Sequence, residues 1–252
     1  KEMTVDTPYQ RFVIIGTART GSSLLWSYLN SHPDILCMRG VFGSTNKINF
    51  GKFYIGLPSE CNSLELVKER NQYPIEFLEE YVFKKYSQKY KAVGFKYFYD
   101  HNRHLLNKHG LTDYFSKDKD VKFIHVKRRN LLAGLYSYKR ALVQQNWTSA
   151  NAYFQTEIST SECEKHFDNT IEQQKQFDRL FDNRTFEIIY EDFINRTPET
   201  LNELQNFLGL PLTILNTETK KNENGNMSEM VTNYTHLKHY FKDSKYRTYF
   251  DE

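Results

Sequence analysis

The sequence predicts an α/β protein with one domain, in which helices flank a mostly parallel central sheet. Five short apolar runs, rich in β-branched and aromatic residues, alternate with segments whose apolar residues recur at helical spacing. This alternation is typical of a parallel sheet, which binds ligands at the carboxyl ends of its strands. The chain has 252 residues and no internal repeat. We therefore predict a single domain over residues 1–252, with its core at about 11–240.

The first predicted strand and helix enclose a short loop with two glycines. Phe12–Ile15 predicts a buried strand that ends at Gly16, and a helix begins after Gly21. The spacing of the two glycines matches the phosphate-binding loop of nucleotide-binding proteins, except that Ser22 replaces the expected lysine. The cation of the loop is instead Arg19, and a guanidinium binds planar oxyanions through two hydrogen bonds. Backbone N–H groups and the helix dipole add to this predicted anion site. The alternative is a tight turn with an incidental arginine.

The next segments continue the alternation. Ile35–Met38 predicts a second strand, and Arg39–Ser63 predicts a long loop rich in glycine and aromatic residues. Pro74–Tyr90 predicts an amphipathic helix with proline in its first turn. Ala92–Phe98 predicts a third strand, so the polar residues 99–101 are expected at the same sheet edge as the first loop.

A second strand-to-helix turn lies further along the chain. Val121–Val126 predicts the fourth strand, and Asn130 predicts the start of the next helix, with the three cations of Lys127–Arg129 at the junction. Cations are disfavoured at a helix N-terminus, so a bound anion would account for them. Ser137 lies two turns into this helix. A surface arginine pair is the alternative interpretation.

The remaining segments complete the pattern. Ser161–Asp182 predicts a long polar helix, and Phe186–Tyr190 predicts the fifth strand. Pro198–Leu208 predicts a helix that a glycine terminates. A loop rich in lysine and asparagine, residues 220–225, precedes a last predicted helix over Ser228–Phe241.

Charge and hydropathy exclude some classes of function. The formal net charge is +3 and the cations are spread along the chain, whereas a dedicated nucleic-acid binder usually carries a basic stripe. We therefore expect an anionic small molecule rather than nucleic acid. No run of residues is long enough to span a membrane, and no signal-peptide pattern is present.

The cysteines favour a reducing compartment. Cys37, Cys61 and Cys163 lie far apart and form no spacing pattern for a metal or a disulfide, so we predict a cytoplasmic protein. The alternative is a lumenal domain with a trimmed N-terminal anchor, because the chain begins at Lys1 and contains Asn-x-Ser/Thr sequons. These sequons are at Asn146, Asn183, Asn195, Asn226 and Asn233.

Residues 16–23 (GTARTGSS) and residues 129–137 (RNLLAGLYS) together resemble two motifs of one family. They are similar to the 5′-phosphosulfate loop and the 3′-phosphate motif of the sulfotransferases that use 3′-phosphoadenosine 5′-phosphosulfate (PAPS). Residues 190–192, 207–210 and 227–234 are also similar to family features. The resemblance spans residues 11 to about 240 and is closest to bacterial carbohydrate-type members, the nodulation-factor and glycolipid sulfotransferases. It implies their P-loop-like fold, with PAPS as donor and the bisphosphate PAP as product.

The resemblance also implies roles for individual residues. The 5′-phosphate would be held by Arg19, Thr20, Gly21, Ser22 and Ser23. Arg129 and Ser137 would hold the 3′-phosphate, and Tyr190 would lie near the adenine. Lys220 or Lys221 would close over the cofactor.

The glutamate that often acts as general base in the sulfotransferases that this chain resembles is absent after the second predicted strand. Members often carry a glutamate in a stretch like Cys-His-Gly-Glu-x-Phe, where this chain has Gly40 or Val41. We predict that His101 replaces it, with Asp100 beside it, because an imidazole titrates near neutral pH. A purely structural histidine is the alternative.

These observations predict in-line transfer of a sulfuryl group from PAPS to a hydroxyl of a carbohydrate or glycolipid. Arg19 and the loop N–H groups would stabilise the charge on the leaving phosphate, and Lys96 would lie beside the transferring group. No metal is expected. One alternative is a P-loop-like nucleotide kinase, which needs the missing lysine and a magnesium site. The other is a catalytically silent PAPS-binding protein, in keeping with the missing glutamate.

Overall fold

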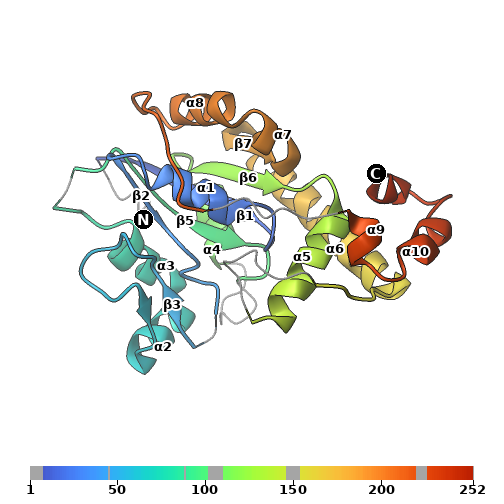
Figure 1. Cartoon of the computed structure of the whole chain (residues 1–252). Helices are drawn as coiled ribbons and strands as arrows, with labels where there is room; N and C mark the ends of the chain where they lie inside the picture. The colour runs from blue at the N-terminus through green and yellow to red at the C-terminus, as the bar shows by residue number, and fades with distance from the viewer. Residues whose placement is uncertain are drawn as a thin grey trace.

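A five-stranded parallel sheet forms the centre of the computed structural model (Figure 1). The structure describes residues 8–44, 46–87, 89–101, 110–145, 154–219 and 226–251. In order across the sheet, the strands are β2 (Ile35–Met38), β5 (Ala92–Phe98), β1 (Gln10–Gly16), β6 (Lys122–Lys127) and β7 (Thr185–Ile189). The predicted fold class is confirmed, and each predicted strand is present with ends that shift by no more than two residues.

The central strand β1 brings three strand ends together. It pairs in parallel with β5 on one side and with β6 on the other, so that Ile14 lies opposite both Lys96 and Ile124. Every residue from Arg11 to Gly16 is buried, because helices cover both faces of the sheet, and such strands are almost continuously apolar. The carboxyl ends of β1, β5 and β6 therefore meet at one edge, where the chain continues into the predicted anion loops.

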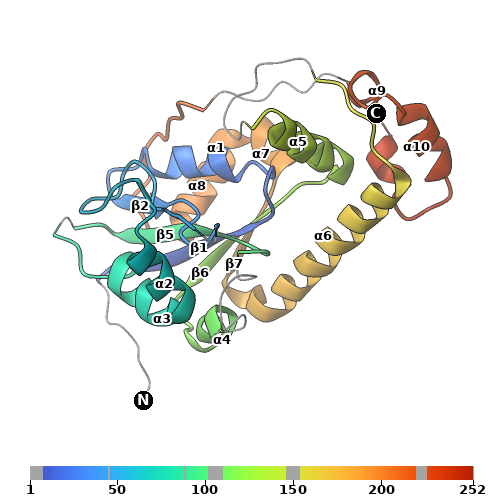
Figure 2. The same ribbon diagram turned by 90° about the horizontal axis from the view of Figure 1, so that it is seen from below.

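Three helices cover one face of the sheet (Figure 2). They are α1 (Ser22–Leu29), α7 (Tyr190–Asn195) and α8 (Thr197–Phe207). Leu25, Phe193 and Leu204, one from each helix, pack in a single apolar cluster with the strands. Burial of such side chains is the main stabilising contribution of this layer.

The opposite face is covered by helices that come mainly from the middle of the chain (Figure 2). These are α2 (Leu64–Gln72), α3 (Pro74–Phe77), the π-helical turn η1 (Leu78–Val82), α4 (Gly110–Lys117) and the long α6 (Thr160–Phe181), which η2 (Asp182–Arg184) follows. Their buried side chains are rich in phenylalanine and tyrosine. This aromatic layer packs against side chains of β1, β2, β5 and β6.

A third apolar cluster lies beyond the sheet. It joins α5 (Leu131–Val143) to the start of α6 and to the C-terminal elements α9 (Met227–Met230), α10 (Tyr234–Tyr240) and η3 (Arg247–Phe250). The C-terminal elements thus pack around the helix that follows β6 (Figure 1).

The helix predicted over Pro74–Tyr90 is too long. The helical backbone ends at Val82, after a π-helical turn. The Tyr86 hydroxyl donates to the Val82 carbonyl at 2.7 Å and so occupies an acceptor that a continuing helix would need. The ring centroids of Tyr86 and Tyr90 lie 5.5 Å apart, and that of Tyr86 lies 6.1 Å from that of Tyr9. These rings pack on one another instead of forming a helical stripe.

The helix predicted over Ser228–Phe241 is interrupted. A parallel bridge joins Val231 to Thr156, and this contact replaces the helical hydrogen bonds between α9 and α10. The Asn233 side chain bonds both the N–H and the carbonyl of Ile158, at 3.2 and 2.8 Å. The break is therefore imposed by a segment distant in sequence.

The other helices predicted from periodicity are confirmed as α1, α5, α6 and α8. The predicted loop over Arg39–Ser63 contains a small antiparallel pair, β3 (Ile48–Asn49) and β4 (Glu60–Cys61). Helices α2, α4 and α7 are not in the prediction. They are 6 to 9 residues long, which is too short for a clear periodic signal.

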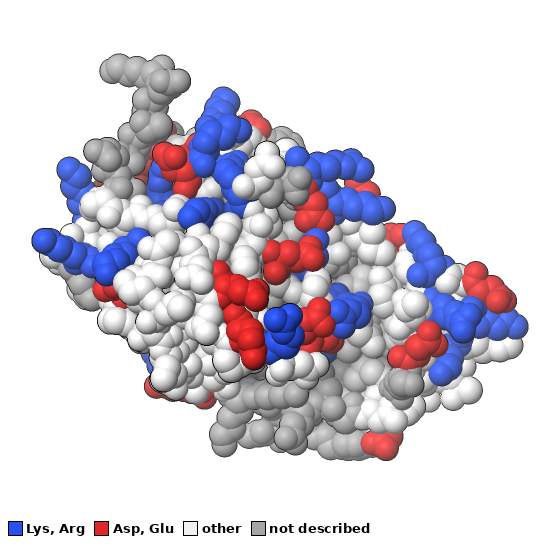
Figure 3. Space-filling view, turned by 90° about the horizontal axis from the view of Figure 1, so that it is seen from above, with Lys and Arg blue, Asp and Glu red and all other residues white. Residues whose placement is uncertain are grey.

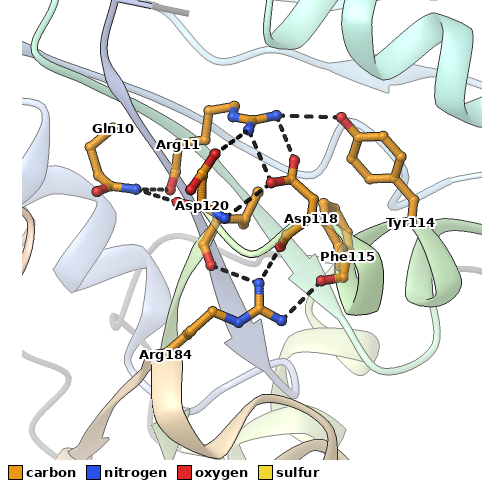
Figure 4. Close-up of polar contacts among 8 residues, drawn as sticks. Gln10, Arg11, Tyr114, Phe115, Asp118, Asp120 and Arg184 are labelled. Carbon is orange, nitrogen blue, oxygen red and sulfur yellow. Dashed lines mark hydrogen bonds and ion pairs between the residues drawn. The ribbon is translucent and has the colours of Figure 1, made fainter. Parts of the chain in front are cut away.

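A buried polar network closes the amino edge of the sheet (Figure 4). Arg11 of β1 forms an ion pair with Asp118, which follows α4, at 2.6 Å. Arg184 of η2 donates to the carbonyls of Phe115 and Val121 at 3.0 and 3.2 Å. The network ties the start of β1 and the segment before β6 to the end of α4.

The surface seen in Figure 3 mixes the two signs of charge. Lysine and arginine side chains alternate there with aspartate and glutamate rather than forming one continuous basic stripe. Within the described ranges, the structure has no helix that combines the length and apolar character needed to cross a bilayer.

Candidate active site

The loop between β1 and α1 has a strained backbone. Arg19 has a φ of 69° and Gly21 a φ of 87°, and residues other than glycine rarely adopt this left-handed region. The Thr20 hydroxyl donates to the Thr17 carbonyl at 2.9 Å and closes the turn. Strain of this kind concentrates at functional sites, and successive N–H groups in such turns form anion-binding concavities.

Tyr190 packs directly on this loop. A Cβ atom added to Gly21 would lie 2.4 Å from Tyr190 Cδ2, so only glycine allows the ring to approach this closely. Tyr190 follows β7 and is the first residue of α7. The guanidinium of Arg128 lies 5.0 Å from the centroid of the same ring. The sheet therefore brings the predicted adenine neighbour to the predicted phosphate loop.

The first turn of α1 faces the end of β5. Ser22 is buried at the helix start, and the Ser23 hydroxyl accepts a hydrogen bond from Lys96 Nζ at 3.2 Å. Burial lowers the pKa of Lys96 to about 8, and the positive charges of Arg39 and Arg19 act in the same direction. Lys96 is thus an ammonium group that loses its proton unusually easily, held beside the loop.

Carboxylates of α7 occupy the start of α5. Glu191 accepts the backbone N–H groups of Arg129 and Asn130 at 2.8 and 3.1 Å. The Arg129 guanidinium pairs with Asp192 at 2.6 Å and is 61% exposed, and Lys127 pairs with carboxylates of α6 and β7. A bound anion is therefore not needed to account for Lys127 and Arg129, because carboxylates of the same chain pair with both.

The two turns meet through Arg128 rather than Arg129. The Arg128 side chain is 9% exposed, and its Nη1 donates to the Arg19 carbonyl at 3.1 Å. Arg19 Nε in turn donates to the Ser137 hydroxyl at 2.9 Å. The loop after β1 and the helix after β6 therefore share one set of contacts, and Arg129 takes no part in these hydrogen bonds.

Arg140 completes a cluster of three guanidinium groups, in which Arg140 is buried and Arg19 and Arg128 are half-buried. It lies one turn after Ser137 on α5 and is 4% exposed. Arg140 Nη2 and Arg128 Nε are buried and have no hydrogen-bond partner in the part of the chain that the structure describes, although Glu191 Oε1 lies 3.7 Å from Arg128 Nε. Burial lowers the pKa of Arg19, as do the positive charges of Arg140 and Arg128. Buried donors are nearly always paired, so this cluster is suited to bind an anion.

Arg128 and Arg140 are not among the site residues predicted from the sequence. Arg140 follows Ser137 by three residues, a spacing that puts both on one helix face, and this was the signal that could have identified it. For Arg128 the run of three cations was visible, but it did not show which of them turns inward.

A cavity of about 270 Å³ opens beside the loop. Its lining includes Arg19, Ser23, Arg39, Lys96 and His101. These residues come from the loop, from α1 and from the ends of β2 and β5. Lys96 and His101 were both predicted at this edge, and the structure brings them into the same cavity.

His101 is buried, with both ring nitrogens closely surrounded. Its Nδ1 accepts the N–H of Phe98 at 3.1 Å, which puts the proton of the neutral ring on Nε2. A Cβ atom on Gly43 would lie 3.1 Å from Nε2, and one on Gly40 would lie 3.4 Å from Cε1. Asp100 is exposed and does not line the cavity. His101 is therefore buried beside the cavity, whereas its neighbour Asp100 faces solvent.

Two predictions for this site are not tested by geometry. Lys220 and Lys221 lie outside the described residues. No group of three or more His, Cys, Asp or Glu side chains suited to a metal ion occurs within the described ranges.

Comparisons with known proteins agree with the fold. The model of a family described as the sulfotransferase family matches residues 78–213, more than half of the chain. A sulfotransferase from Alicyclobacillus acidocaldarius superposes with a TM-score of 0.51 and 14% identity, over 95% of this chain and 92% of that protein. The sulfotransferase domain of the olefin synthase of Synechococcus PCC 7002 matches with a TM-score of 0.46 and 17% identity, over 83% of this chain and 77% of that domain. No curated protein sequence matches this chain.

Proposed function

The chain belongs to the sulfotransferase family, and on this basis we propose that it transfers a sulfuryl group from PAPS to a hydroxyl of a carbohydrate or glycolipid. PAP would be the second product. The observation that carries the proposal is the meeting of the two strand-to-helix turns at three guanidinium groups, those of Arg19, Arg128 and Arg140. An adenine nucleotide with phosphates at both the 3′ and 5′ positions matches such a site.

The side chains fit the donor as follows. The N–H groups of the strained loop, with Arg19, would hold the 5′-phosphate. Arg128, Arg140 and Ser137 would hold the 3′-phosphate, which would supply hydrogen-bond acceptors for Arg128 Nε and Arg140 Nη2. Tyr190 would stack on the adenine. In this proposal Arg129 keeps its pair with Asp192, which revises the assignment that the motif implies.

The reaction requires charge to be stabilised on the leaving phosphate. When bound, PAPS supplies the sulfuryl group, whose S–O bond to phosphate breaks as the acceptor oxygen bonds to sulfur. The electron pair stays on the phosphate oxygen, where Arg19 and the loop N–H groups would stabilise it. Lys96 Nζ, which is 3.2 Å from Ser23 Oγ, would stabilise the charge of the sulfuryl oxygens.

His101 is the proposed acceptor of the hydroxyl proton. It lines the cavity next to Lys96, although its Nδ1 is already an acceptor for the Phe98 N–H. Proton uptake at the ring therefore requires the loss of that hydrogen bond. The proton would bind either to Nδ1 directly or to Nε2 in the tautomer that carries its proton on Nδ1. In this mechanism Asp100, which is exposed, would act only on the local charge around His101.

Calorimetric titration with PAP, 5′-AMP and ATP tests the proposed donor site. We expect PAP to bind at least 10-fold more tightly than 5′-AMP, because only PAP carries the 3′-phosphate. Arg128→Gln and Arg140→Gln should each remove most of this difference, whereas the control Arg129→Gln should keep it.

Two other results would favour the alternative functions. Tighter binding of ATP with magnesium than of PAP would indicate a nucleotide kinase. PAPS binding without transfer of radioactive sulfate to any of a broad panel of hydroxyl acceptors would indicate a silent binding protein. Equal affinities for PAP and 5′-AMP would contradict the assignment of the 3′-phosphate site.

A further inference from the structure

The charged side chains that line the cavity beside the loop are all positive. Arg19, Arg39, Lys47 and Lys96 contribute to its lining, and none of its described lining residues is an aspartate or glutamate. The transfer of a sulfuryl group, as proposed above, explains why the positive charges of Arg19 and Lys96 face the cavity. Arg39 and Lys47 also line the cavity, and the transferring group does not account for their charges.

Arg39 is positioned as a fixed anion-binding group. It follows β2, and its carbonyl accepts the N–H of Lys96 at 3.2 Å, so it lies beside the end of β5. Its guanidinium stacks on Trp26, 4.2 Å from the ring centroid. Stacking on an aromatic ring orients the planar fork of donors and reduces the entropy lost on binding. Arg39 therefore presents a preorganised guanidinium to the cavity.

The nearby carboxylate is already engaged by other groups. Glu60 of β4 pairs with Lys47 at 3.4 Å and accepts a hydrogen bond from Asn49 Nδ2 at 2.9 Å. Lys47 and Glu60 are both about half exposed, so water screens this pair. Arg39 forms no ion pair in the part of the chain that the structure describes. Burial lowers its pKa, while the charge of Glu60 raises it.

These observations rest on the proposed function and deepen it. We infer that the acceptor carries, besides its hydroxyl, a second and negatively charged group, a carboxylate, sulfate or phosphate, that Arg39 binds. A neutral acceptor would cover the Arg39 guanidinium without replacing the lost hydration, whereas an anion makes charge-assisted hydrogen bonds with it. The cavity volume of about 270 Å³ is below the range of about 300–1,000 Å³ for drug-sized ligands, so one sugar-sized unit fits it.

Matched pairs of ligands test this inference. The full chain, saturated with PAP, is titrated calorimetrically with 4-nitrophenyl β-D-glucuronide and with 4-nitrophenyl β-D-glucoside, which differ only at C6, a carboxylate in the first and a hydroxymethyl group in the second. Glucose 6-phosphate and glucose form a second pair, and comparing the pairs distinguishes carboxylate from phosphate. We expect the charged member of at least one pair to bind 10-fold or more tightly, with an affinity that falls as salt rises.

Variants assign the preference to Arg39. Arg39→Gln should abolish the preference and Arg39→Lys should retain part of it, because an ammonium keeps the charge but not the fork. Arg196→Gln, at a side chain that is 67% exposed, is the control and should keep the preference in full. Circular dichroism checks that each variant is folded, and the salt dependence of the unmodified protein tests the inference without any variant.

The outcomes separate this inference from the proposed function. Equal binding within both pairs, or no binding by any of the four ligands, would overturn the inference, as would a preference that survives in Arg39→Gln. Failure of PAP to bind would instead reject the donor site. In that case the same ligand pairs, titrated into the unloaded chain, still report whether the cavity prefers an anion.

Discussion

Arg19 carries both the backbone strain and the central charge of the site. Its φ of 69° leaves its carbonyl as the acceptor for Arg128, and its Nε donates to Ser137. The side chain and the backbone of this residue therefore connect different partners. Replacing the side chain removes the charge but leaves the Arg128 contact to the carbonyl available.

We predict that Arg19→Ala lowers turnover with PAPS by about 10²- to 10³-fold, because it removes the main charge that would face the leaving phosphate. The measurement is kcat from transfer of radioactive sulfate at saturating PAPS. Arg196→Ala, a substitution of an exposed arginine, serves as the control. Unchanged turnover in Arg19→Ala would rule out its catalytic role.

Lys96 gives the reaction a predicted pH dependence. Burial lowers its pKa to about 8, so it is an ammonium below that pH and a neutral amine above it. If its charge stabilises the sulfuryl oxygens, kcat/KM for PAPS falls as pH rises through about 8, because kcat/KM reports the pKa of the free enzyme, and Lys96→Met has a low kcat/KM without this fall. A kcat/KM that instead rises through pH 8 in the unmodified protein would identify the neutral amine as the general base.

At the scale of elements, β7 and α7 organise both turns. The first three residues of α7 each have a separate contact: Tyr190 packs on Gly21, Glu191 caps α5, and Asp192 pairs with Arg129. A strand end and one helical turn thus hold the loop after β1 and the helix after β6 in fixed positions. The proposed donor site is thus largely formed in the unliganded chain, which would reduce the cost of binding.

Gly21→Ala should lower the affinity for PAP at least 10-fold, because its Cβ would displace the Tyr190 ring in addition to straining a backbone with a φ of 87°. Gly56→Ala is the matched control, since Gly56 has a φ of 103° and no atom within 4 Å of the added Cβ. It should lower stability without changing PAP affinity. Equal losses of affinity in both variants would show that Tyr190 has no role in the site.

At the scale of the whole molecule, the carboxyl and amino ends of the strands carry different features. The carboxyl edge carries the strained loop, the guanidinium cluster and the cavity. The amino edge is closed by the pair of Arg11 with Asp118 and by the carbonyls that Arg184 binds (Figure 4). Stability and ligand binding can therefore be changed separately.

Arg11→Ala should lower the free energy of unfolding by about 3–5 kcal/mol, because it leaves the buried Asp118 carboxylate without its partner. Lys245→Ala, which breaks an exposed pair with Asp168, should have a much smaller effect. Denaturant titration measures both. The PAP affinity of folded Arg11→Ala should be unchanged, and a loss of affinity would show that the two edges are coupled.

Much of the fold could be predicted from local patterns, because strands buried on both faces, such as β1 and β5, are continuously apolar. The loop from Gly16 to Ser23 could also be predicted, because the spacing of its two glycines is a local sequence pattern. The break at Val231 could not, because it depends on Thr156. The inward turn of Arg128 likewise depends on Glu191 and Asp192, which follow a different strand. Sequence patterns show which residues are available, whereas the packing of distant segments selects among them.

The third apolar cluster has a practical consequence for anyone who shortens this protein. Residues 226–251 supply Met227, Tyr234, Phe241 and Phe250 to the cluster that covers α5, and α5 carries Ser137 and Arg140. A version cut before residue 226 would expose the apolar side of that helix to water. Its failure would first be seen as aggregation and lost nucleotide recognition, even though every residue assigned to the nucleotide remained in the chain.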